Sequence, residues 1–189
     1  MDVALLFLTK ESMNIRKLNY LCYYAQAYHL ALLNKPLFNE DFEAWIHGPT
    51  SPKLMNTYKK EYGINKIPKP NKINNNFNQD TMWVLENVKN TFMEYSEYEL
   101  ETLTKEEKPW IKARKGYDRI EHCNEKIKLK DMREYFLHFL EVDLECPNCS
   151  SIIENGVISG EYGTKINHCE QCHTDFILTT DDEIFIKKC

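Results

Sequence analysis

The 189-residue sequence predicts a mostly α-helical domain with a short β element, followed by a small β module. Apolar residues recur at three- and four-residue steps through most of the first 140 residues, which is typical of amphipathic helices. Between two such stretches, residues 42–46 alternate in polarity as a short strand does. Residues 143–189 have few large apolar side chains but carry two Cys-x-x-Cys pairs, which indicates a separate, small unit.

A long helix is expected over residues 15–33. Asn14 has the short polar side chain of an N-cap, and the segment 34–36 contains the proline that ends the pattern. Tyr20, Tyr23, Tyr24 and Tyr28 make this helix aromatic nearly all round. Such a helix is either a central core helix or a partner-binding face, and the core interpretation is favoured.

After the strand at 42–46, His47-Gly48-Pro49-Thr50 is expected to form a turn. Ser51 and Pro52 then supply an N-cap and a first-position proline for a helix that Gly63 ends. Residues 64–79 are rich in Asn, Lys and Pro, which predicts an exposed and mobile loop.

Further helices are expected to complete the first domain. Asp80 is expected to cap one of them, and Ser96 with Glu99 forms a capping box in front of the next. Residues 104–107 repeat the box pattern ahead of Pro109 and Trp110. A last amphipathic helix is expected to start near Asp131, and the domain to end at about residue 142.

The C-terminal segment contains a cysteine pattern typical of a zinc ribbon. Cys146 and Cys149 form one Cys-x-x-Cys pair, and Cys169 and Cys172 form a second, with nineteen residues between the two pairs. Each pair places two thiolates on one tight turn, and four thiolates make a closed tetrahedral shell. We therefore expect one structural Zn²⁺ that contributes folding energy, with no open position for a reacting water.

Two disulfides or a thiol redox site are the alternatives to zinc. The N-terminal segment has neither a basic leader nor a small-residue cleavage site, so a reducing, cytoplasmic location is expected, where structural disulfides are rare. His168 and His173 flank the second pair and are either substitute ligands or, preferably, solvent-facing turn residues. Cys22 lies in the apolar pattern of the first long helix and is expected in the core.

The charge is divided unevenly along the chain. Residues 143–189 hold three basic and nine acidic residues, a net charge of −6, whereas residues 1–142 hold 21 basic and 20 acidic residues. Binding to a phosphate backbone needs a surplus of Lys and Arg. The charge therefore disfavours nucleic acid as a partner and favours a protein-contact or scaffold role for the ribbon.

Several segments of the first domain have a specific order and spacing. They are residues 17–31, 35–38 and 42–49, followed by residues 95–96, Leu100, 103–107, 109–110 and 113–114. Together they resemble the Panacea domain, also called the SocA-like antitoxin domain, which is related to GepA-type phage-associated proteins. The resemblance runs from about Asp2 to Leu140 and does not cover the zinc ribbon. Lys105 stands where the family usually carries histidine.

The resemblance implies a helical antitoxin domain, which we place at residues 1–142, ahead of the zinc ribbon that the cysteine pattern predicts at residues 143–189. Such domains are encoded beside diverse toxins and neutralise them by direct binding. At least one family member is thought to deliver its toxin to an AAA+ protease. The alternatives are therefore a proteolytic adaptor, a DNA-binding regulator that uses the ribbon or the 66–72 loop, and a phage-encoded inhibitor of a host defence protein.

The residues themselves offer no convincing catalytic group, so we expect a binding protein and no enzyme. His29 and His47 could pair with Glu43 or Asp41 as base and orienter, but a hydrogen-bonded core histidine is the favoured interpretation. The aromatic, Gly and Pro positions are interpreted first as fold determinants, and alternatively as a concave surface that receives a toxin segment. The candidate partner-binding residues are Tyr20, Tyr24, Tyr28, Trp45, His47, Gly48, Pro49, Pro109 and Trp110.

Overall fold

Two compact units make up the computed structural model, Met1–Met132 and Arg133–Cys189. The structure describes residues 2–63, 65–71, 76–138, 142–156, 158–159, 166–179 and 184–187. The first unit is helical with one short hairpin and the second is mainly β, which confirms the predicted fold class. Among these residues, no helix combines the length and apolarity needed to span a bilayer.

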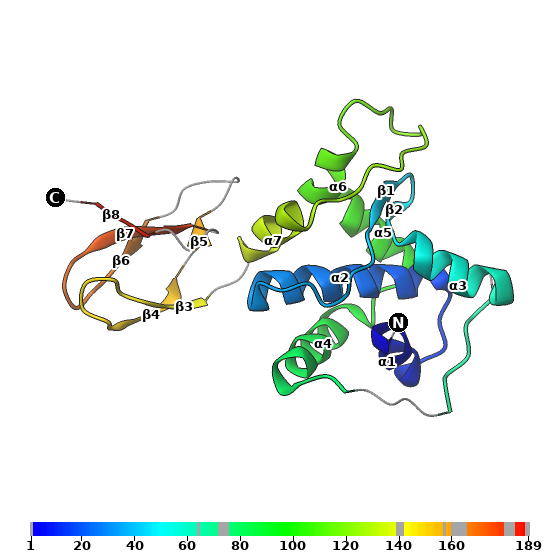
Figure 1. Ribbon diagram of the computed structural model, residues 1–189, viewed down its shortest axis with the longest axis horizontal. Coiled ribbons are helices and arrows are strands. Elements are labelled where there is room, and N and C mark those ends of the chain that lie inside the picture. The colour runs from blue at the N-terminus through cyan, green and yellow to red at the C-terminus, as the bar shows by residue number, and fades with distance from the viewer. Residues whose placement is uncertain are drawn as a thin grey trace. The chain divides into compact units, whose positions relative to one another are not determined.

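Helix α2 (Ile15–Leu33) is the centre of the first unit. The Asn14 side chain accepts from the Lys17 amide at its start, and Asn34 adopts a left-handed conformation (φ 50°) at its end. Helix α1 (Asp2–Lys10), which the sequence analysis did not predict, packs against it. Figure 1 shows α1 and α4 on one side of α2, and α5 with the β1–β2 hairpin on the other.

The hairpin joins β1 (Glu43–Trp45) to β2 (Gly48–Thr50), with Trp45 opposite Gly48. The turn is therefore Ile46-His47, and the predicted turn at residues 47–50 is wrong because Gly48 already pairs as a strand residue. Helix α3 (Pro52–Tyr62) follows directly. Its Ser51 cap and its stop at Gly63 confirm the prediction.

The segment after α3 is partly buried. Ile67 is only 2% exposed, its amide donates to the Met13 carbonyl at 2.8 Å, and Ser12 Oγ donates to the Ile67 carbonyl at 2.9 Å. The prediction of an exposed loop is therefore wrong at Ile67, because one apolar residue anchors the chain between polar neighbours. Residues 64 and 72–75 lie outside the described residues.

Four more helices follow in the described part of the chain: α4 (Gln79–Phe92), α5 (Glu97–Glu106), α6 (Lys108–Ala113) and α7 (Leu129–Leu137). Asn78, two residues before the predicted Asp80, caps α4 by accepting from the Thr81 amide. The predicted Ser96–Glu99 capping box is present at the start of α5.

The second predicted capping box, at residues 104–107, does not form. Thr104 is buried inside α5, and its hydroxyl donates to the Leu100 carbonyl at 2.8 Å instead of capping a new helix. Helix α6 follows Glu107, whose side chain makes no cap hydrogen bond. Helix α7 begins at Leu129, two residues ahead of the predicted start at Asp131.

The described residues of the second unit form two small sheets. Strands β3 (Val142–Glu145) and β4 (Ile152–Gly156) pair antiparallel. In the other sheet, β7 (Asp175–Thr179) pairs antiparallel with β6 (Asn167–His168) and β8 (Ile184–Lys187), and parallel with β5 (Ile158–Ser159).

Candidate functional site

Helix α2 fixes the hairpin through a buried amide side chain. Asn19 Nδ2 donates to the Pro49 carbonyl at 2.6 Å, and Asn19 Oδ1 accepts from the Ser51 amide at 2.8 Å. Asn19 is 2% exposed, so water does not reach its amide group, and these two bonds satisfy the buried polar atoms instead. The junction between β2 and α3 is therefore held at a fixed place on α2.

Gly48 allows the hairpin to approach α2 and α5 closely. Its φ is +106°, and a Cβ there would lie 2.9 Å from Thr104 Oγ1 and 3.1 Å from Tyr20 Cε1. The Tyr20 hydroxyl donates to the His47 carbonyl, just before Gly48. Burial, with a smaller contribution from the nearby Glu101 charge, raises the pKa of Tyr20, so this phenol remains a hydrogen-bond donor.

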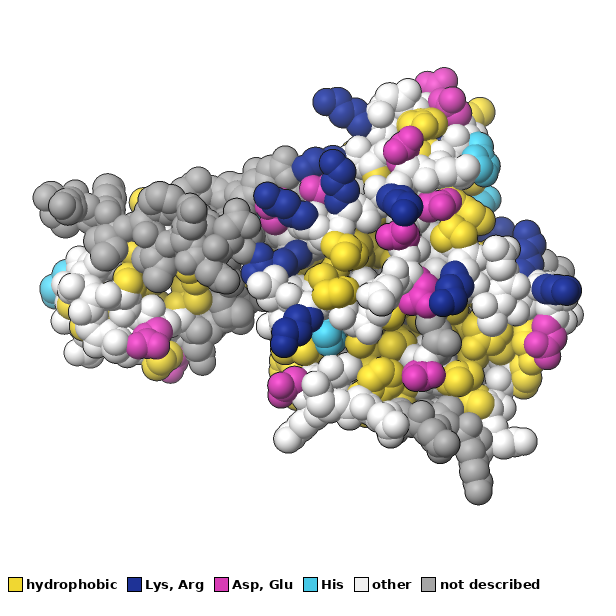
Figure 2. All heavy atoms as spheres, in the orientation of Figure 1, with side chains coloured by type: hydrophobic (Ala, Val, Ile, Leu, Met, Phe, Trp, Pro, Cys, Tyr) yellow, Lys and Arg dark blue, Asp and Glu magenta, His cyan; other side chains and the backbone are white. Residues whose placement is uncertain are grey.

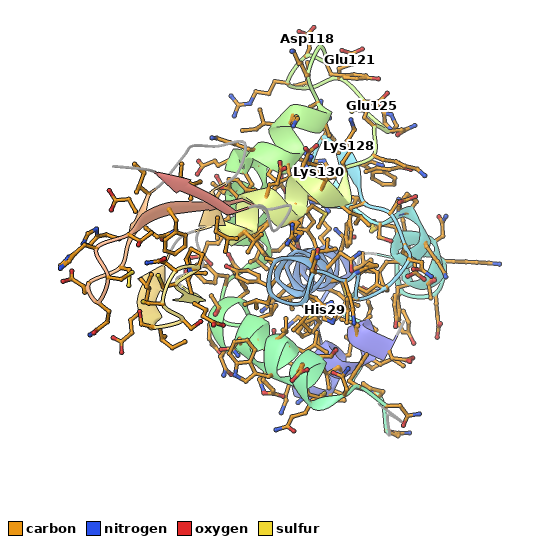
Figure 3. The ribbon with its side chains drawn as sticks, turned by 60° about the vertical axis from the view of Figure 1, so that its left-hand side comes forward. His29, Asp118, Glu121, Glu125, Lys128 and Lys130 are labelled. Carbon is orange, nitrogen blue, oxygen red and sulfur yellow. The ribbon has the colours of Figure 1, made fainter. Side chains whose placement is uncertain are left out.

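Helix α6 holds the other strand of the hairpin. Trp110 Nε1 donates to the Trp45 carbonyl at 2.9 Å, and Arg114 Nη1 donates to the Ala44 carbonyl at 2.8 Å. Arg114 Nη2 also donates to the carbonyls of Asp118 and Glu121, at 2.9 and 2.6 Å. Arg114 thus joins β1 to the loop between α6 and α7, on which Figure 3 shows Asp118 and Glu121.

Between α5 and α6, the carboxyl of Glu107 is buried against α2. The Tyr24 hydroxyl donates to Glu107 Oε1 at 2.9 Å. Burial raises the pKa of Glu107 to about 7, although hydrogen bonding from Tyr24 and then Tyr23 favours the charged form. Desolvation therefore outweighs the hydroxyl donors, and the group exchanges its proton near neutral pH.

A pocket of about 310 Å³ lies between α2, the hairpin, α3 and the start of α5. Its size is at the lower end of the range for ligand sites, roughly 300–1,000 Å³. Apolar and cationic side chains share its lining, among them Arg16, Tyr20, Trp45, His47, Met55 and Lys59. Asn19, Gly48 and Ser51 position these elements, so the pocket is a direct consequence of the hairpin's attachment to α2.

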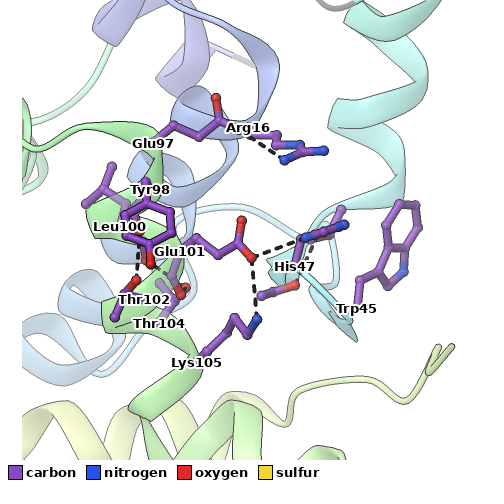
Figure 4. Close-up of polar contacts among 12 residues, drawn as sticks. Arg16, Trp45, His47, Glu97, Tyr98, Leu100, Glu101, Thr102, Thr104 and Lys105 are labelled. Carbon is purple, nitrogen blue, oxygen red and sulfur yellow. Dashed lines mark hydrogen bonds and ion pairs between the residues drawn. The ribbon is translucent and has the colours of Figure 1, made fainter. Parts of the chain in front are cut away.

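Figure 4 shows the ion pairs beside this pocket. His47 Nδ1 lies 3.2 Å from Glu101 Oε1, and Lys105 Nζ lies 3.4 Å from the same oxygen. Arg16 Nη1 lies 3.2 Å from Glu97 Oε1. The pocket therefore carries mixed charge around an aromatic and aliphatic floor.

The candidate histidine–carboxylate pairs are not formed. Glu43 accepts from Trp45 Nε1 at 2.7 Å, and Asp41 pairs with Lys126 at 2.6 Å. His29 is buried on α2, where its two nitrogens bond to the Lys35 carbonyl at 2.7 Å and to Thr81 Oγ1 at 3.1 Å. His29 is therefore a hydrogen-bonded core residue, as predicted.

In the second unit, four cysteine sulfurs gather in one cluster. The sulfurs of Cys146, Cys149, Cys169 and Cys172 all lie within 4.8 Å of one another. The Cys146–Cys172 and Cys149–Cys169 separations are 3.6 Å, far longer than a disulfide bond of about 2.05 Å. A tetrahedral ion with metal–sulfur bonds of about 2.3 Å would place its ligands about 3.8 Å apart, so the cluster fits such an ion.

The two Cys-x-x-Cys turns have the same backbone geometry. The Ser150 amide donates to the Cys146 carbonyl at 2.9 Å, and the His173 amide donates to the Cys169 carbonyl at 2.8 Å. Ser150 and His173 both have positive φ, 58° and 55°. His168 bonds to Asp175 at 2.7 Å and is exposed, so among the described residues the geometry brings together the four thiols as a donor set.

The first unit was compared with known families. The family described as antitoxin SocA-like, Panacea domain, has a model that matches residues 18–111. Residues 18–111 belong to the SocA-like Panacea family. The match covers most of α2, the hairpin, α3 to α5 and the start of α6, and it suggests an antitoxin-type role. No curated protein and no solved structure was found to match the chain.

Within the Panacea domain, the residues predicted to contact a partner fall into three groups. Tyr20, Trp45 and His47 line the pocket. Tyr28 lies elsewhere on α2, in a smaller hollow of about 40 Å³ beside Phe92. The buried group comprises Tyr24, Gly48, Pro49, Pro109 and Trp110.

Sequence reasoning did not select Arg16, Met55 and Lys59, which also line the pocket. Exposed cations on α2 and α3 carry no local signal for a pocket, since their convergence depends on how the hairpin places α3 against α2. Knowledge of the Asn19–Pro49 and Asn19–Ser51 contacts would have been needed to find them.

Proposed function

We propose that this chain is an antitoxin that neutralises a protein toxin by direct binding through its Panacea domain, without catalysis. The family match over residues 18–111 is the observation that carries the proposal. Nine of the twelve residues that line the pocket fall in the same range, which gives the domain a concave surface of the kind that receives an anchoring side chain.

The proposed contact surface is the pocket and its rim. Trp45 and His47 are partly or largely exposed there, and the buried Tyr20 forms part of the floor. Aromatic side chains in such positions are frequent binding hot spots. The buried Tyr24, Gly48, Pro49, Pro109 and Trp110 would then support the surface from below instead of touching the toxin.

We propose that the cysteine cluster holds one structural Zn²⁺, with Cys146, Cys149, Cys169 and Cys172 as its ligands. Zinc prefers four thiolates in a tetrahedron, and the sulfur separations of 3.6 Å support that arrangement. The ion would stabilise the zinc ribbon at residues 143–189, while residues 1–142 form the antitoxin domain. Its binding energy would appear as folding energy of the ribbon.

The proposed partner is a protein in the reducing cytoplasm, where zinc-bound thiolates persist. On the face drawn in Figure 2, Lys and Arg side chains lie among Asp and Glu side chains and hydrophobic patches over the helical unit. Mixed charge of this kind suits a protein surface better than a phosphate backbone, which needs a surplus of cations.

Co-expression tests the proposal. The product of the adjacent reading frame should arrest growth when expressed alone, and growth should resume when this chain is expressed with it. Trp45→Asp should lose the protection, whereas Trp83→Asp, at an exposed tryptophan of α4 outside the pocket, should keep it. Continued arrest in the presence of the wild-type chain would refute an antitoxin role.

The division of the chain into two units also suits an adaptor, in which one unit holds the toxin and the other presents it to a protease. Immunoblots of the same cultures separate the two functions. Direct neutralisation predicts that the toxin accumulates in a complex with this chain. An adaptor predicts that the toxin disappears, and that deleting residues 143–189 restores its level.

A further inference from the structure

The pocket of the Panacea domain has an apolar floor and cations on two sides. Ile15 and Tyr20 are 6% and 2% exposed and form part of the floor with the partly buried Met55. Arg16 on α2 and Lys59 on α3 line the same pocket and are exposed. A ligand on the floor would therefore have cations within reach from two helices.

The negative groups around the pocket are already engaged. Glu97 accepts from both Asn14 Nδ2 and Arg16 Nη1, and Glu101 is shared by His47 and Lys105. Lys59 has no carboxylate within ion-pair distance among the described residues. Arg16 meets Glu97 through one nitrogen and keeps 47% of its side chain exposed, so the unsatisfied charge of the pocket is positive.

We propose that this pocket binds an acidic segment of the toxin: a bulky apolar side chain occupies the floor, and an Asp or Glu close to it in the toxin sequence pairs with Lys59 and Arg16. The inference rests on the proposed antitoxin function and adds the chemistry of the bound segment. Charge complementarity decides between acidic and basic partners, because a basic segment would be repelled by Arg16 and Lys59, whereas Glu97 and Glu101 are already engaged by cations of this chain.

The ion pair between Lys59 and the toxin should affect both the binding affinity and the association rate. Charges at the rim of an interface act mainly on the association rate and on its salt dependence. A charge reversal at Lys59 should therefore slow association at low salt, and the effect should shrink at about 0.5 M salt, where the screening length falls to a few ångströms.

Helix α3 offers a matched control for this test. Lys59 and Lys60 are neighbours, both exposed, but only Lys59 lines the pocket. Binding of the purified product of the adjacent reading frame to the full chain would be measured by surface plasmon resonance. Lys59→Glu should weaken binding by about fivefold or more at low salt, and Lys60→Glu by less than about twofold.

The floor has its own matched pair. Met55 on α3 and Met82 on α4 are both partly buried helical methionines, and only Met55 lines the pocket. Met55→Glu should weaken binding by about tenfold or more, while Met82→Glu should leave it within about twofold. Circular dichroism and urea unfolding would establish that both variants keep the fold.

A charge swap gives the decisive outcome. Cross-linking to Lys59 identifies the acidic toxin residue that pairs with it. Replacing that toxin residue by Lys should restore binding to the Lys59→Glu chain. Equal effects of Lys59→Glu and Lys60→Glu, or tighter binding by Lys59→Glu, would overturn the inference while wild-type binding still upheld the antitoxin proposal. If the wild-type chain binds no toxin at all, both proposals fail.

Discussion

Gly48 lies at the meeting point of the hairpin, α2 and α5, where a single methyl group would alter the packing. Its φ of +106° strains any L side chain, and the added Cβ would lie 2.9 Å from Thr104 Oγ1. Backbone strain of this kind costs about 1–3 kcal/mol. The steric clash adds to it, because Thr104 is fully buried and its hydroxyl is held by the Leu100 carbonyl.

We therefore predict that Gly48→Ala lowers the free energy of unfolding by about 2–4 kcal/mol, as measured by urea denaturation. Gly116→Ala is the control: its φ is +96°, but no atom lies within 4 Å of the added Cβ. It should show the backbone strain alone, about 1–2 kcal/mol. Equal losses in the two variants would show that contact with Thr104 and Tyr20 contributes nothing.

Glu107 gives a pH dependence whose sign follows from its environment. Burial raises its pKa in the folded chain from the usual 4.5 to about 7, so the folded state binds this proton more tightly than the unfolded state. Below about pH 4.5 the protonated Glu107 makes its full contribution to the free energy of unfolding. That contribution is lost as the pH rises from 4.5 to about 7. At 1.36 kcal/mol per pH unit, the loss is on the order of 3 kcal/mol.

Glu107→Gln keeps an acceptor for the Tyr24 hydroxyl and removes the titration. Relative to the wild type, its free energy of unfolding should rise between about pH 5 and about pH 8, by up to about 3 kcal/mol in urea melts. Parallel stability profiles for the two proteins across this range would contradict a raised pKa at Glu107. Glu106→Gln, at an exposed neighbour, should leave the profile unchanged.

Predictions for single residues were correct where the interaction involves only neighbours in the sequence. Asn14, Ser51 and the Ser96–Glu99 pair cap their helices as predicted, because a cap needs only a short polar side chain beside the first turn. Asp80 was predicted to cap α4, but the cap is Asn78, which has the same kind of short polar side chain. The Thr104 box failed because its hydroxyl bonds within α5 and tertiary packing keeps the residue buried.

At the scale of elements, the long periodic helix α2 could be predicted and the short elements only in part. The core interpretation of its tyrosines holds for Tyr20, Tyr23 and Tyr24, each at most 2% exposed. Strand β2 was taken for a turn because Gly-Pro is a frequent turn pair. Its pairing with β1 depends on Asn19 holding the Pro49 carbonyl, a contact thirty residues away in sequence.

The metal-binding element gives a prediction that separates the two units. If the cysteine cluster holds a structural Zn²⁺ as proposed, Cys146→Ser or Cys169→Ser should remove it and unfold the ribbon, because the ion would supply much of the folding energy of so small a unit. Zinc analysis by mass spectrometry should find about one equivalent in the wild type and none in either variant. The helical signal in circular dichroism should stay nearly unchanged.

His168→Gln is the control for the cysteine variants. His168 lies beside Cys169 but bonds to Asp175, so this change should retain the ion and the folded ribbon. Loss of zinc in His168→Gln would contradict a donor set of four thiols. Freshly purified wild-type protein without any zinc would contradict the assignment of the ion itself.

For the whole molecule, the two units imply independent folding. A chain that ends after residue 142 should unfold cooperatively in urea, because the core around α2 lies within Met1–Met132. Its unfolding midpoint should equal that of the helical unit in the full-length protein. Adding a chelator to the full-length protein should change the unfolding signal of the ribbon and leave the unfolding midpoint of the helical unit unchanged. A truncated chain without cooperative unfolding would show that the helical unit depends on the ribbon.

The family and the mainly helical fold could be predicted from the sequence, because they depend on ordered motifs from α2 to α6. The pocket could be predicted only in part. Trp45 and His47 stood out as an aromatic and a histidine beside Gly-Pro, whereas Arg16 and Lys59 are ordinary exposed cations until α2 and α3 bring them together. The convergence of side chains from separate helices has no counterpart in local sequence patterns.

The most direct test of the account is a titration of toxin activity with the purified chain. The toxin here is the purified product of the adjacent reading frame. If the chain neutralises it by stoichiometric binding, toxin activity should fall linearly and reach zero at a fixed molar ratio. Native mass spectrometry should show an intact complex of that same ratio, with the toxin unmodified. Loss of activity at far smaller amounts of the chain, or with a chemically altered toxin, would instead show turnover and contradict neutralisation by binding.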